Sequence, residues 1–281
     1  MEGSTLFSDA MALQQVADGV FQGALNEHWT IGPKVHGGAM LALCAAAARA
    51  AHGGAVQPIA VSTSYLSAPD PGPMQLRTFV RKRGRTVSVV DVELIQGARS
   101  REQHEEQKAA VHAVITLGEP EHQAPPLLSA NPVAALMDPE PPSDARSIGP
   151  GHPMAGLVNL AAGCDVRPLM SSVPTEGMPS DGRPPAIQMW VKPRGAAADI
   201  LFALMCGDIS VPVAFAVGRR GWAPTVQLTA YLRGVPADGW LRVLCTTTQI
   251  GRDWFDEDHI VVDADGRIVV QTRQLALVPS H

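Results

Sequence analysis

The sequence predicts an α+β protein of two tandem repeats, each with a central helix wrapped by a curled antiparallel sheet. Three observations predict this fold class. Each half has one apolar segment that favours helix, each helix is followed by alternating strand-like runs, and one residue pattern occurs twice. A helix that is apolar on most sides must be covered on most sides, and a curled sheet supplies that cover.

The helix of the first half is predicted over residues 39–51, directly after Gly37-Gly38. This segment is rich in Ala and Leu, which favour helix, and it is apolar nearly all round. The glycine pair Gly53-Gly54 ends the helix. Strands are expected at residues 57–66, 74–83, 85–95 and 108–117.

The second half follows a similar order of elements. Its helix is predicted over residues 198–206, between strands at residues 166–169, 186–191, 225–232, 240–249, 259–262 and 267–278. Tyr65-Leu66, a turn and Leu76-Arg77 in the first half correspond to Tyr231-Leu232, a turn and Leu241-Arg242 in the second.

A segment dense in Pro and Gly separates the two halves. We therefore expect an N-terminal unit at residues 1–118, a linker at residues 119–158 and a C-terminal unit at residues 159–281.

The composition excludes several classes of protein. Hydrophobic residues make up 46% of the 281 residues, which is enough for a core and excludes a mainly disordered chain. The formal charge is 22 − 27 = −5, which is unfavourable for a general nucleic-acid binder. We expect no leader peptide, because the first five residues lack a basic and an apolar region, and no membrane span, because the longest apolar stretch, at residues 39–51, is too short. The four cysteines lie far apart in apolar surroundings, as buried free thiols do in a reducing compartment. We expect a cytoplasmic protein with no nucleic-acid or membrane partner.

A series of short motifs carries a resemblance to a known family. In the first half they are Val35-His36-Gly37-Gly38, Ser64-Tyr65-Leu66 followed by Pro69 and Gly72, and Arg83-Gly84-Arg85-Thr86. In the second half they are Met189-Trp190-Val191, Gly207-Asp208 with Pro212-Val213-Ala214, Thr225 and Gln274. Their order and spacing resemble the bacterial type II acyl-CoA thioesterases over nearly the whole chain after about Phe21.

The resemblance implies a double hot-dog fold and hydrolysis of acyl-CoA to a free acid and CoA, without a metal or other cofactor. In that family an Asp, a Thr or Ser and a Gln together position a water, and the matching residues here are Asp208, Thr225 and Gln274. The sequence departs from the family after Thr225, where Val226-Gln227-Leu228 replaces a common Asp-His pair. We also expect a homo-oligomer, a dimer or larger.

The residue types fit this chemistry, although each also has a simpler interpretation. Asp208 follows an apolar run, so burial would raise its pKa above the usual value of about 3.9 and make it a better base; a cap of the next turn is the alternative. Gln274 could instead be a solvent-facing strand residue. Gly37 and Gly38 can offer backbone N–H groups to an oxyanion, or they form only a tight turn. His36 either orients the substrate or only packs against its neighbours. We do not expect it to bind a metal, because no second ligand lies at helical or hairpin spacing from it.

The two halves are predicted to share one composite site. The first half has the glycine pair but no Asp or Glu from residue 28 to residue 69, whereas the second half has Asp208. The second helix opens on Asp199, whose charge would repel an oxyanion. Gly37 or Gly38 should therefore lie within roughly 10 Å of the Asp208 carboxylate, since donors and base must reach one carbonyl.

A basic run at residues 77–85 has two interpretations. It holds five cations in nine residues, including Arg81, Lys82 and Arg83. These could bind the phosphates of CoA, or they could keep a solvated hairpin tip soluble.

Two rival functions remain at this point. One is a hot-dog hydratase acting on enoyl-CoA, because residues 207–212 resemble its motif; the His that this motif needs after the Pro is absent from Val213-Ala214-Phe215. The other is a catalytically silent acyl-CoA-binding protein, which a thiol-release assay would distinguish from an enzyme.

Overall fold

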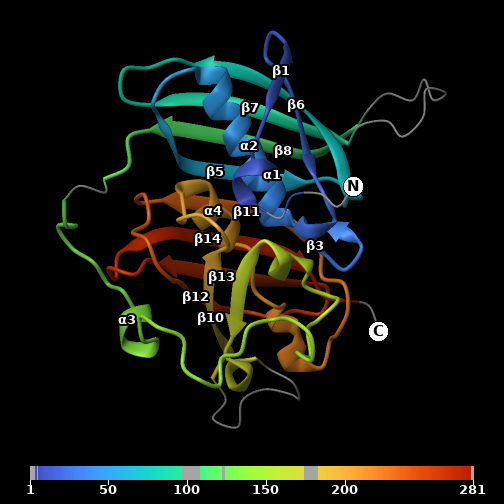
Figure 1. Cartoon of the computed structure of the whole chain (residues 1–281), viewed down its shortest axis with the longest axis vertical. Coiled ribbons are helices and arrows are strands. Elements are labelled where there is room, and N and C mark those ends of the chain that lie inside the picture. Colours follow the sequence, from blue (N-terminus) through green and yellow to red (C-terminus); the bar gives the residue numbers. More distant parts are fainter. Residues whose placement is uncertain (1–3, 5, 97–107, 122–123, 174–182, 280–281) are drawn as a thin grey trace.

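One antiparallel sheet of twelve strands organises the molecule (Figure 1). The computed structural model describes all residues except 1–3, 5, 97–107, 122–123, 174–182 and 280–281. The strands lie in the order β1-β2-β6-β7-β8-β5-β11-β14-β13-β12-β10-β9. From the middle outward, each half has the same succession of pairings, which is the repeat expected from the sequence.

The strands of the first half are β1 (Gln14–Ala17), β2 (Val20–Leu25), β5 (Gln57–Tyr65), β6 (Gly72–Lys82), β7 (Ser88–Gln96) and β8 (Ala109–Gly118). Those of the second half are β9 (Cys164–Pro168), β10 (Ala186–Pro193), β11 (Thr225–Leu232), β12 (Leu241–Thr246), β13 (Trp254–Val262) and β14 (Ile268–Leu277). A separate two-stranded sheet joins β3 (Thr30–Ile31) to β4 (Lys34–Val35).

Two apolar helices pack against this sheet and against each other. Helix α2 (Gly37–His52) contacts β2, β5, β6, β7 and β8, and its inner residues are buried nearly all round. Helix α4 (Ile200–Cys206) is buried along its whole length and contacts β11, β14 and α2. The shorter helices are α1 (Phe7–Ala10), α3 (Val133–Leu136), η1 (Glu27–Trp29), η2 (Asn159–Ala162), η3 (Met170–Ser172) and η4 (Val213–Val217).

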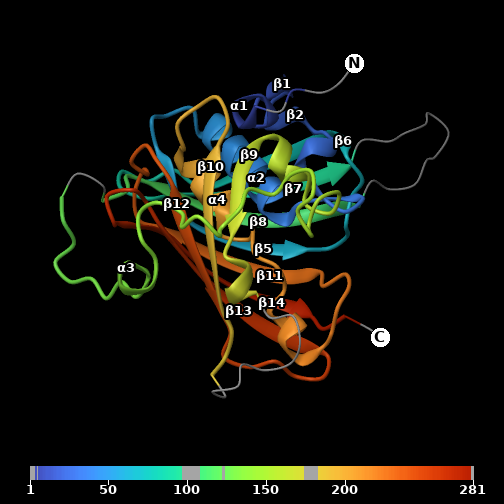
Figure 2. The ribbon, with the colours of Figure 1, turned by 60° about the horizontal axis from the view of Figure 1, so that its bottom comes forward.

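The α+β hot-dog architecture is as expected, but the sheet differs from the expectation of one curled sheet for each repeat. Strands β5 and β11 pair with each other, from Ser64 opposite Gln227 to Ala60 opposite Tyr231. The strands of both halves therefore form a single sheet, and β5 and β11 lie side by side at its middle (Figures 1 and 2). Pairing satisfies backbone groups that two separate sheets would leave at exposed edges.

The differences in element boundaries matter for the site. Helix α2 begins at Gly37, so both glycines belong to its first turn rather than preceding it. It ends at Gly53 in the left-handed conformation, φ 71°, as the sequence indicates. Strand β13 begins at Trp254, five residues before the predicted start, and so includes Glu257. A strand was expected before the first helix without a residue range, and two strands of the twelve-stranded sheet, β1 and β2, lie there.

The expectation of free, buried thiols is confirmed for all four cysteines, Cys44, Cys164, Cys206 and Cys245. Among the residues described, none of the helices combines the length and the apolar character that crossing a membrane requires.

Candidate active site

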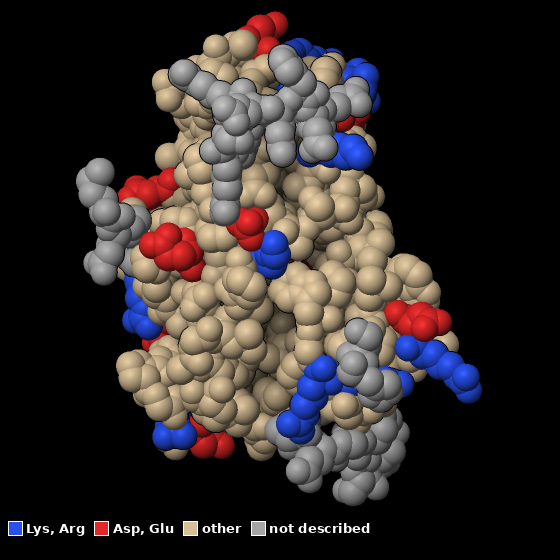
Figure 3. Space-filling view, turned by 90° about the vertical axis from the view of Figure 1, so that its right-hand side faces the viewer, with Lys and Arg blue, Asp and Glu red and all other residues tan. Residues whose placement is uncertain are grey.

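A cavity of about 810 Å³ lies between the two halves of the chain. Its wall is mostly apolar. It comes from segments at residues 31–40, 65–68, 153–158, 170–173 and 208–226 and from the strands β13 and β14. The wall residues at 153–158 fall within the segment expected to be a linker, so part of that segment helps to build the site. Figure 3 views the side of the molecule near β3, where the surface is hollowed and largely uncharged.

The polar residues of the wall include most of those predicted for the site. Those predicted are His36, Gly37, Asp208, Thr225 and Gln274. The wall also contains Tyr65, Ser67, Ser210, Arg220 and Glu257, which the sequence argument did not assign. The structure thus brings the glycine end of the first half and the carboxylate of the second half to one place.

The first turn of α2 is fixed by His36, its N-cap. The ring Nδ1 of His36 accepts a hydrogen bond from the Ala39 N–H at 3.2 Å, so the ring proton lies on Nε2. This Nε2–H donates to the backbone carbonyl of Asp208 at 2.8 Å. Burial lowers the pKa of His36 to about 4, against the smaller opposing effect of that hydrogen bond, so the ring is neutral at physiological pH. His36 therefore connects the start of α2 in the first half to Asp208, just after α4 in the second half.

The backbone around Asp208 is held on both sides. The Asp208 N–H donates at 3.2 Å to the carbonyl of Met205, a residue in the last turn of α4. The carbonyl of Gly207 accepts from the Thr272 hydroxyl at 2.6 Å, on the neighbouring strand β14. Together with the His36 contact, these bonds fix the direction of the Asp208 side chain.

The carboxyl of Asp208 has an unusually high pKa. Its side chain is 8% exposed, and burial raises its pKa from 3.8 to about 7. A hydrogen bond from the Gly38 N–H stabilises the ionised form and partly opposes this shift. At neutral pH a substantial fraction of the carboxyl is ionised and able to accept a proton, as a general base requires.

The two glycines are needed because other atoms occupy the space where a side chain would lie. A Cβ on Gly37 would be 2.5 Å from Asp208 Oδ2 and 3.4 Å from the Tyr65 ring. A Cβ on Gly38 would be 2.5 Å from the Met205 carbonyl oxygen and 3.1 Å from Asp208 Cβ. The start of α2 and the end of α4 are therefore in direct contact, well within the 10 Å expected.

Thr225 and Gln274 are joined by a hydrogen bond across neighbouring strands. The Thr225 hydroxyl on β11 donates to Gln274 Oε1 on β14 at 3.0 Å. The other end of the amide, Gln274 Nε2, donates to Glu257 Oε2 on β13, directly opposite in the register. Gln274 is 6% exposed, so it is not the solvent-facing strand residue that was the alternative.

Glu257 is a second buried carboxyl in the cavity. It is 2% exposed, and its other oxygen, Oε1, accepts the Val213 N–H at 2.7 Å. Burial raises its pKa to about 8; the bonds from Val213 and Gln274 lower it, and the charge of Asp208 raises it further. In the sequence, Glu257 is distinguished only by lying two residues before the apolar strand predicted at residues 259–262.

Glu257 also belongs to a buried cluster with Cys245 and His259, whose ligand-type atoms lie within 4.8 Å of one another. These three are the described residues that could hold a metal ion. However, both oxygens of Glu257 already accept hydrogen bonds, and His259 Nε2 lies 2.9 Å from the Ser210 hydroxyl. These groups are thus engaged within the protein, whereas the buried Nδ1 of His259 has no hydrogen-bond partner among the described residues.

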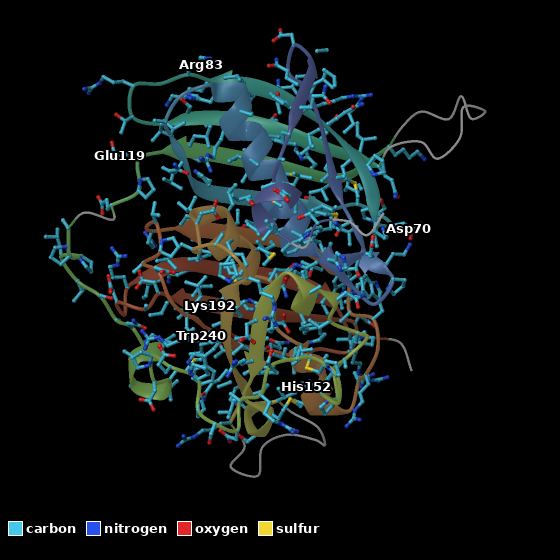
Figure 4. All side chains as sticks on the ribbon, in the orientation of Figure 1. Asp70, Arg83, Glu119, His152, Lys192 and Trp240 are labelled. Carbon is cyan, nitrogen blue, oxygen red and sulfur yellow. The ribbon has the colours of Figure 1, made fainter. Side chains whose placement is uncertain are left out.

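The basic run at residues 77–85 does not reach the cavity. Arg81 is paired with Asp91 at 2.6 Å, and Arg83 donates to the carbonyls of Ala51 and His52 at the C-terminal end of α2. That end is the opposite one from Gly37. Figure 4 shows Arg83 far from Asp70, which pairs at 2.9 Å with Lys34, the residue between the wall residues Pro33 and Val35. The wall contains none of Arg81, Lys82 and Arg83. These contacts favour the interpretation of a solvated hairpin tip.

Comparisons with known proteins agree with this geometry. Two family models match: the N-terminal domain of acyl-CoA thioesterase over residues 25–118 and the C-terminal domain over residues 129–278. Uncharacterized proteins of Mycobacterium bovis and Mycobacterium tuberculosis are 62% identical over 302 residues, covering 99% of this chain and all of theirs.

Solved structures share the fold. A thioesterase II candidate from Thermobifida fusca has a TM-score of 0.79 at 25% identity and covers 98% of this chain and 97% of its own. The acyl-CoA thioesterase II of Mycobacterium marinum has a TM-score of 0.66 at 15% identity, with 98% and 97% covered. With both family models matched in order along its length, this chain belongs to the type II acyl-CoA thioesterase family and has its hot-dog fold.

Proposed function

We propose that the protein hydrolyses acyl-CoA thioesters by water attack, with Asp208 as general base. One observation carries the proposal: the buried carboxyl of Asp208 faces the start of α2 inside an apolar cavity that also contains Thr225 and Gln274. Thioester hydrolysis requires a base whose pKa is near neutral pH, hydrogen-bond donors for the carbonyl oxygen and a cavity for the acyl chain.

The hydrogen bonds decide which role each polar residue takes. Because the Thr225 hydroxyl gives its proton to Gln274 Oε1, its oxygen keeps lone pairs for a proton of the attacking water. Glu257 holds the Gln274 amide in the orientation that makes this possible. The water thus donates one proton toward Asp208 and the other toward Thr225, and its own lone pair is left for the carbonyl carbon.

The reaction balances with these groups. Asp208 takes a proton from water while the new O–C bond forms and the carbonyl π electrons move to oxygen. The tetrahedral intermediate then collapses, the C–S bond breaks, and protonated Asp208 returns the proton to the CoA sulfur. The products are the free acid, which ionises, and CoA as its thiol.

The cavity indicates the class of acyl group. Its volume lies in the upper part of the range of ligand sites, about 300–1,000 Å³. Met40, Met154, Leu157, Val211 and Phe215 are among the apolar wall residues. These features favour an acyl chain of several carbons rather than acetyl. A cytoplasmic location and a homo-oligomer stay predictions.

The hydratase alternative is disfavoured by His36. Its ring is 3.9 Å from the Asp208 carboxylate, but one ring nitrogen accepts from Ala39 and the other donates to the Asp208 carbonyl. Neither nitrogen is therefore available to pass a proton to a substrate, as an Asp–His hydratase pair would need.

A screen of thiol release across acyl-CoA chain lengths tests the proposal. We expect release of CoA with the highest kcat/KM for apolar chains longer than acetyl. The protein's own thiols should give little background, because all four are buried. Tight binding of acyl-CoA without any release would show a silent binding protein, and hydration of an enoyl-CoA without thiol release would show the hydratase.

A further inference from the structure

Tyr65 presents a buried hydroxyl that no protein group uses. It is the last residue of β5 and forms part of the cavity wall. Within the described part of the chain, its buried hydroxyl oxygen has no hydrogen-bond partner. A buried polar group without a partner costs free energy, so a donor in this position indicates a ligand that accepts its hydrogen bond.

The start of α2 has one unused donor as well. Its first N–H groups have no partner within the helix. The N–H of Gly38 donates to the Asp208 carboxylate, that of Ala39 to His36 Nδ1, and that of Met40 to the His36 carbonyl. The N–H of Gly37, which lies at the cavity wall, has no partner among the residues that the structure describes. Of the two glycines, Gly37 therefore has the N–H available for an oxyanion.

These two donors border the same space. The ring carbons Cε1 and Cζ of Tyr65, the second of which carries the hydroxyl, lie 3.4 Å from the position of a Cβ on Gly37. The Asp208 carboxylate lies on the same side of Gly37, at 2.5 Å from that position. A carbonyl group placed there would have two donors on its oxygen and the base nearby.

We infer that the Tyr65 O–H and the Gly37 N–H together bind the thioester carbonyl oxygen and stabilise the oxyanion that it becomes. This inference rests on the proposed hydrolysis and assigns Tyr65 as a further catalytic residue. Burial and the charge of Asp208 raise the pKa of Tyr65 well above its usual range, so the hydroxyl keeps its proton. Paired donors of this kind act on charge that develops only in the transition state.

The repeat supplies a matched control. Tyr231 occupies the corresponding place in the second half, on β11, and these are the two tyrosines of the chain. Its side chain is 51% exposed, its ring lies 5.8 Å from the Arg233 guanidinium, and it takes no part in the cavity wall. The two halves thus hold the same residue type in two environments, one oriented to the site and one to solvent.

The test compares Tyr65→Phe with Tyr231→Phe by thiol release. We expect Tyr65→Phe to lower kcat by about 10²–10³-fold with a much smaller change in KM, as loss of one oxyanion donor does. Tyr231→Phe should stay within about twofold of the wild type. The Tm of Tyr65→Phe should equal or exceed that of the wild type, because an unpaired buried hydroxyl is removed.

A second measurement works without turnover. A ketone analogue of the acyl-CoA, with CH₂ in place of sulfur and ¹³C at the carbonyl, is bound to each variant and observed by NMR. Donation by Tyr65 should move the bound carbonyl signal downfield in the wild type and in Tyr231→Phe, and less in Tyr65→Phe.

The outcomes separate this inference from the proposed function. If the wild type releases thiol and Tyr65→Phe retains kcat within a few-fold, the role of Tyr65 is overturned while hydrolysis stands. If the wild type releases no thiol, the proposed hydrolysis is wrong. Independently of that result, an equal carbonyl shift in all three proteins would overturn the assignment of Tyr65 as a donor to the carbonyl oxygen. Lost activity with a lower Tm and an unchanged carbonyl shift would assign Tyr65 a structural role and overturn the inference.

Discussion

The starts of the two buried helices occupy equivalent places in the repeat, yet they have opposite chemistry. Helix α2 starts at Gly37 and Gly38, its N-cap is a neutral imidazole, and the cavity lies against it. Helix α4 starts after Asp199, whose carboxylate accepts from the Phe202 N–H at 2.8 Å. A carboxylate cap satisfies a helix and closes it to other anions.

The difference shows how one site can arise from two similar halves. The end of α4 supplies Asp208, and the start of α2 supplies the backbone that receives it. The N-terminal end of a helix favours negative charge, so α2 stabilises the ionised Asp208 that burial disfavours. One half has kept the open helix start and the other half the carboxylate, and each would be incomplete alone.

The largest effect should come from removing the carboxylate. Asp208→Asn is nearly isosteric, and turnover should fall by about 10²–10⁴-fold because the general base is lost. Its pH dependence should agree: wild-type kcat/KM should rise as pH increases, with a midpoint near 7, the pKa of Asp208. A pH profile of wild-type thiol release and a single-pH comparison of the variant measure both. Turnover of the variant within a few-fold of the wild type would contradict the assignment.

The same substitution has a stability consequence of known sign. The pKa of Asp208 is about 7 in the folded state, above the unfolded value of 3.8. The folded state therefore binds more protons between those pH values, and the free energy of unfolding falls as pH rises from about 4 to 7. In Asp208→Asn this fall in the free energy of unfolding is absent, because the amide does not titrate. The variant should be more stable than the wild type at pH 8 and similar below pH 4.

The next largest effect should come from the start of α2. Gly37→Ala would place a methyl group 2.5 Å from Asp208 Oδ2, so carboxylate and helix must separate. We expect kcat to fall by roughly 10²-fold, as when an oxyanion donor is displaced. Gly149→Ala is the matched control, because a Cβ there meets open space. Equal kcat for the two variants would mean that the opening of α2 is not part of the site.

Much of this comparison could be predicted from the sequence. The resemblance to the thioesterase family assigned Asp208 to the site. The glycine pair before an apolar helix and the absence of acidic residues around it then predicted that both halves meet there. These are local features: a helix start needs particular residues, and a buried carboxylate needs apolar neighbours.

What could not be predicted depends on partners far apart in the chain. Residues 253–258 hold four acidic residues, which are typical of a loop, so β13 was predicted too short and Glu257 was missed. Only its position opposite Gln274 gives it a role. The carbonyls that Arg83 binds lie about thirty residues earlier, at the end of α2, and no charge pattern reveals backbone acceptors.

A smaller effect is expected at Glu257. In Glu257→Gln the new amide can turn either way, so Gln274 is held less firmly toward Thr225, and kcat should fall about tenfold. The midpoint near pH 7 should stay, because it belongs to Asp208, whereas any change in rate near pH 8 should disappear with the Glu257 carboxyl. Full pH profiles of kcat for both proteins measure this. A midpoint that moves with the substitution would assign the titration to Glu257.

The smallest effect on catalysis should come from the closed helix start. Asp199→Ala removes the cap of α4 and should lower the free energy of unfolding by about 1 kcal/mol. The kcat should remain within about twofold, because Asp199 is not among the residues that line the cavity. Denaturant unfolding and thiol release measure the two quantities. A large loss of kcat without a loss of stability would show that the two helix starts are less different than their caps indicate.

The pairing of β5 with β11 has a consequence for how the site responds to dilution. Two separate half-size subunits would lose a shared site once their concentration fell below the dissociation constant of the dimer. Here the half that supplies Gly37 and the half that supplies Asp208 belong to one polypeptide. This covalent connection keeps the effective concentration of each half high at any protein concentration. The rate per molecule should therefore be the same in a nanomolar assay as in a concentrated stock, whatever larger assembly the chain forms.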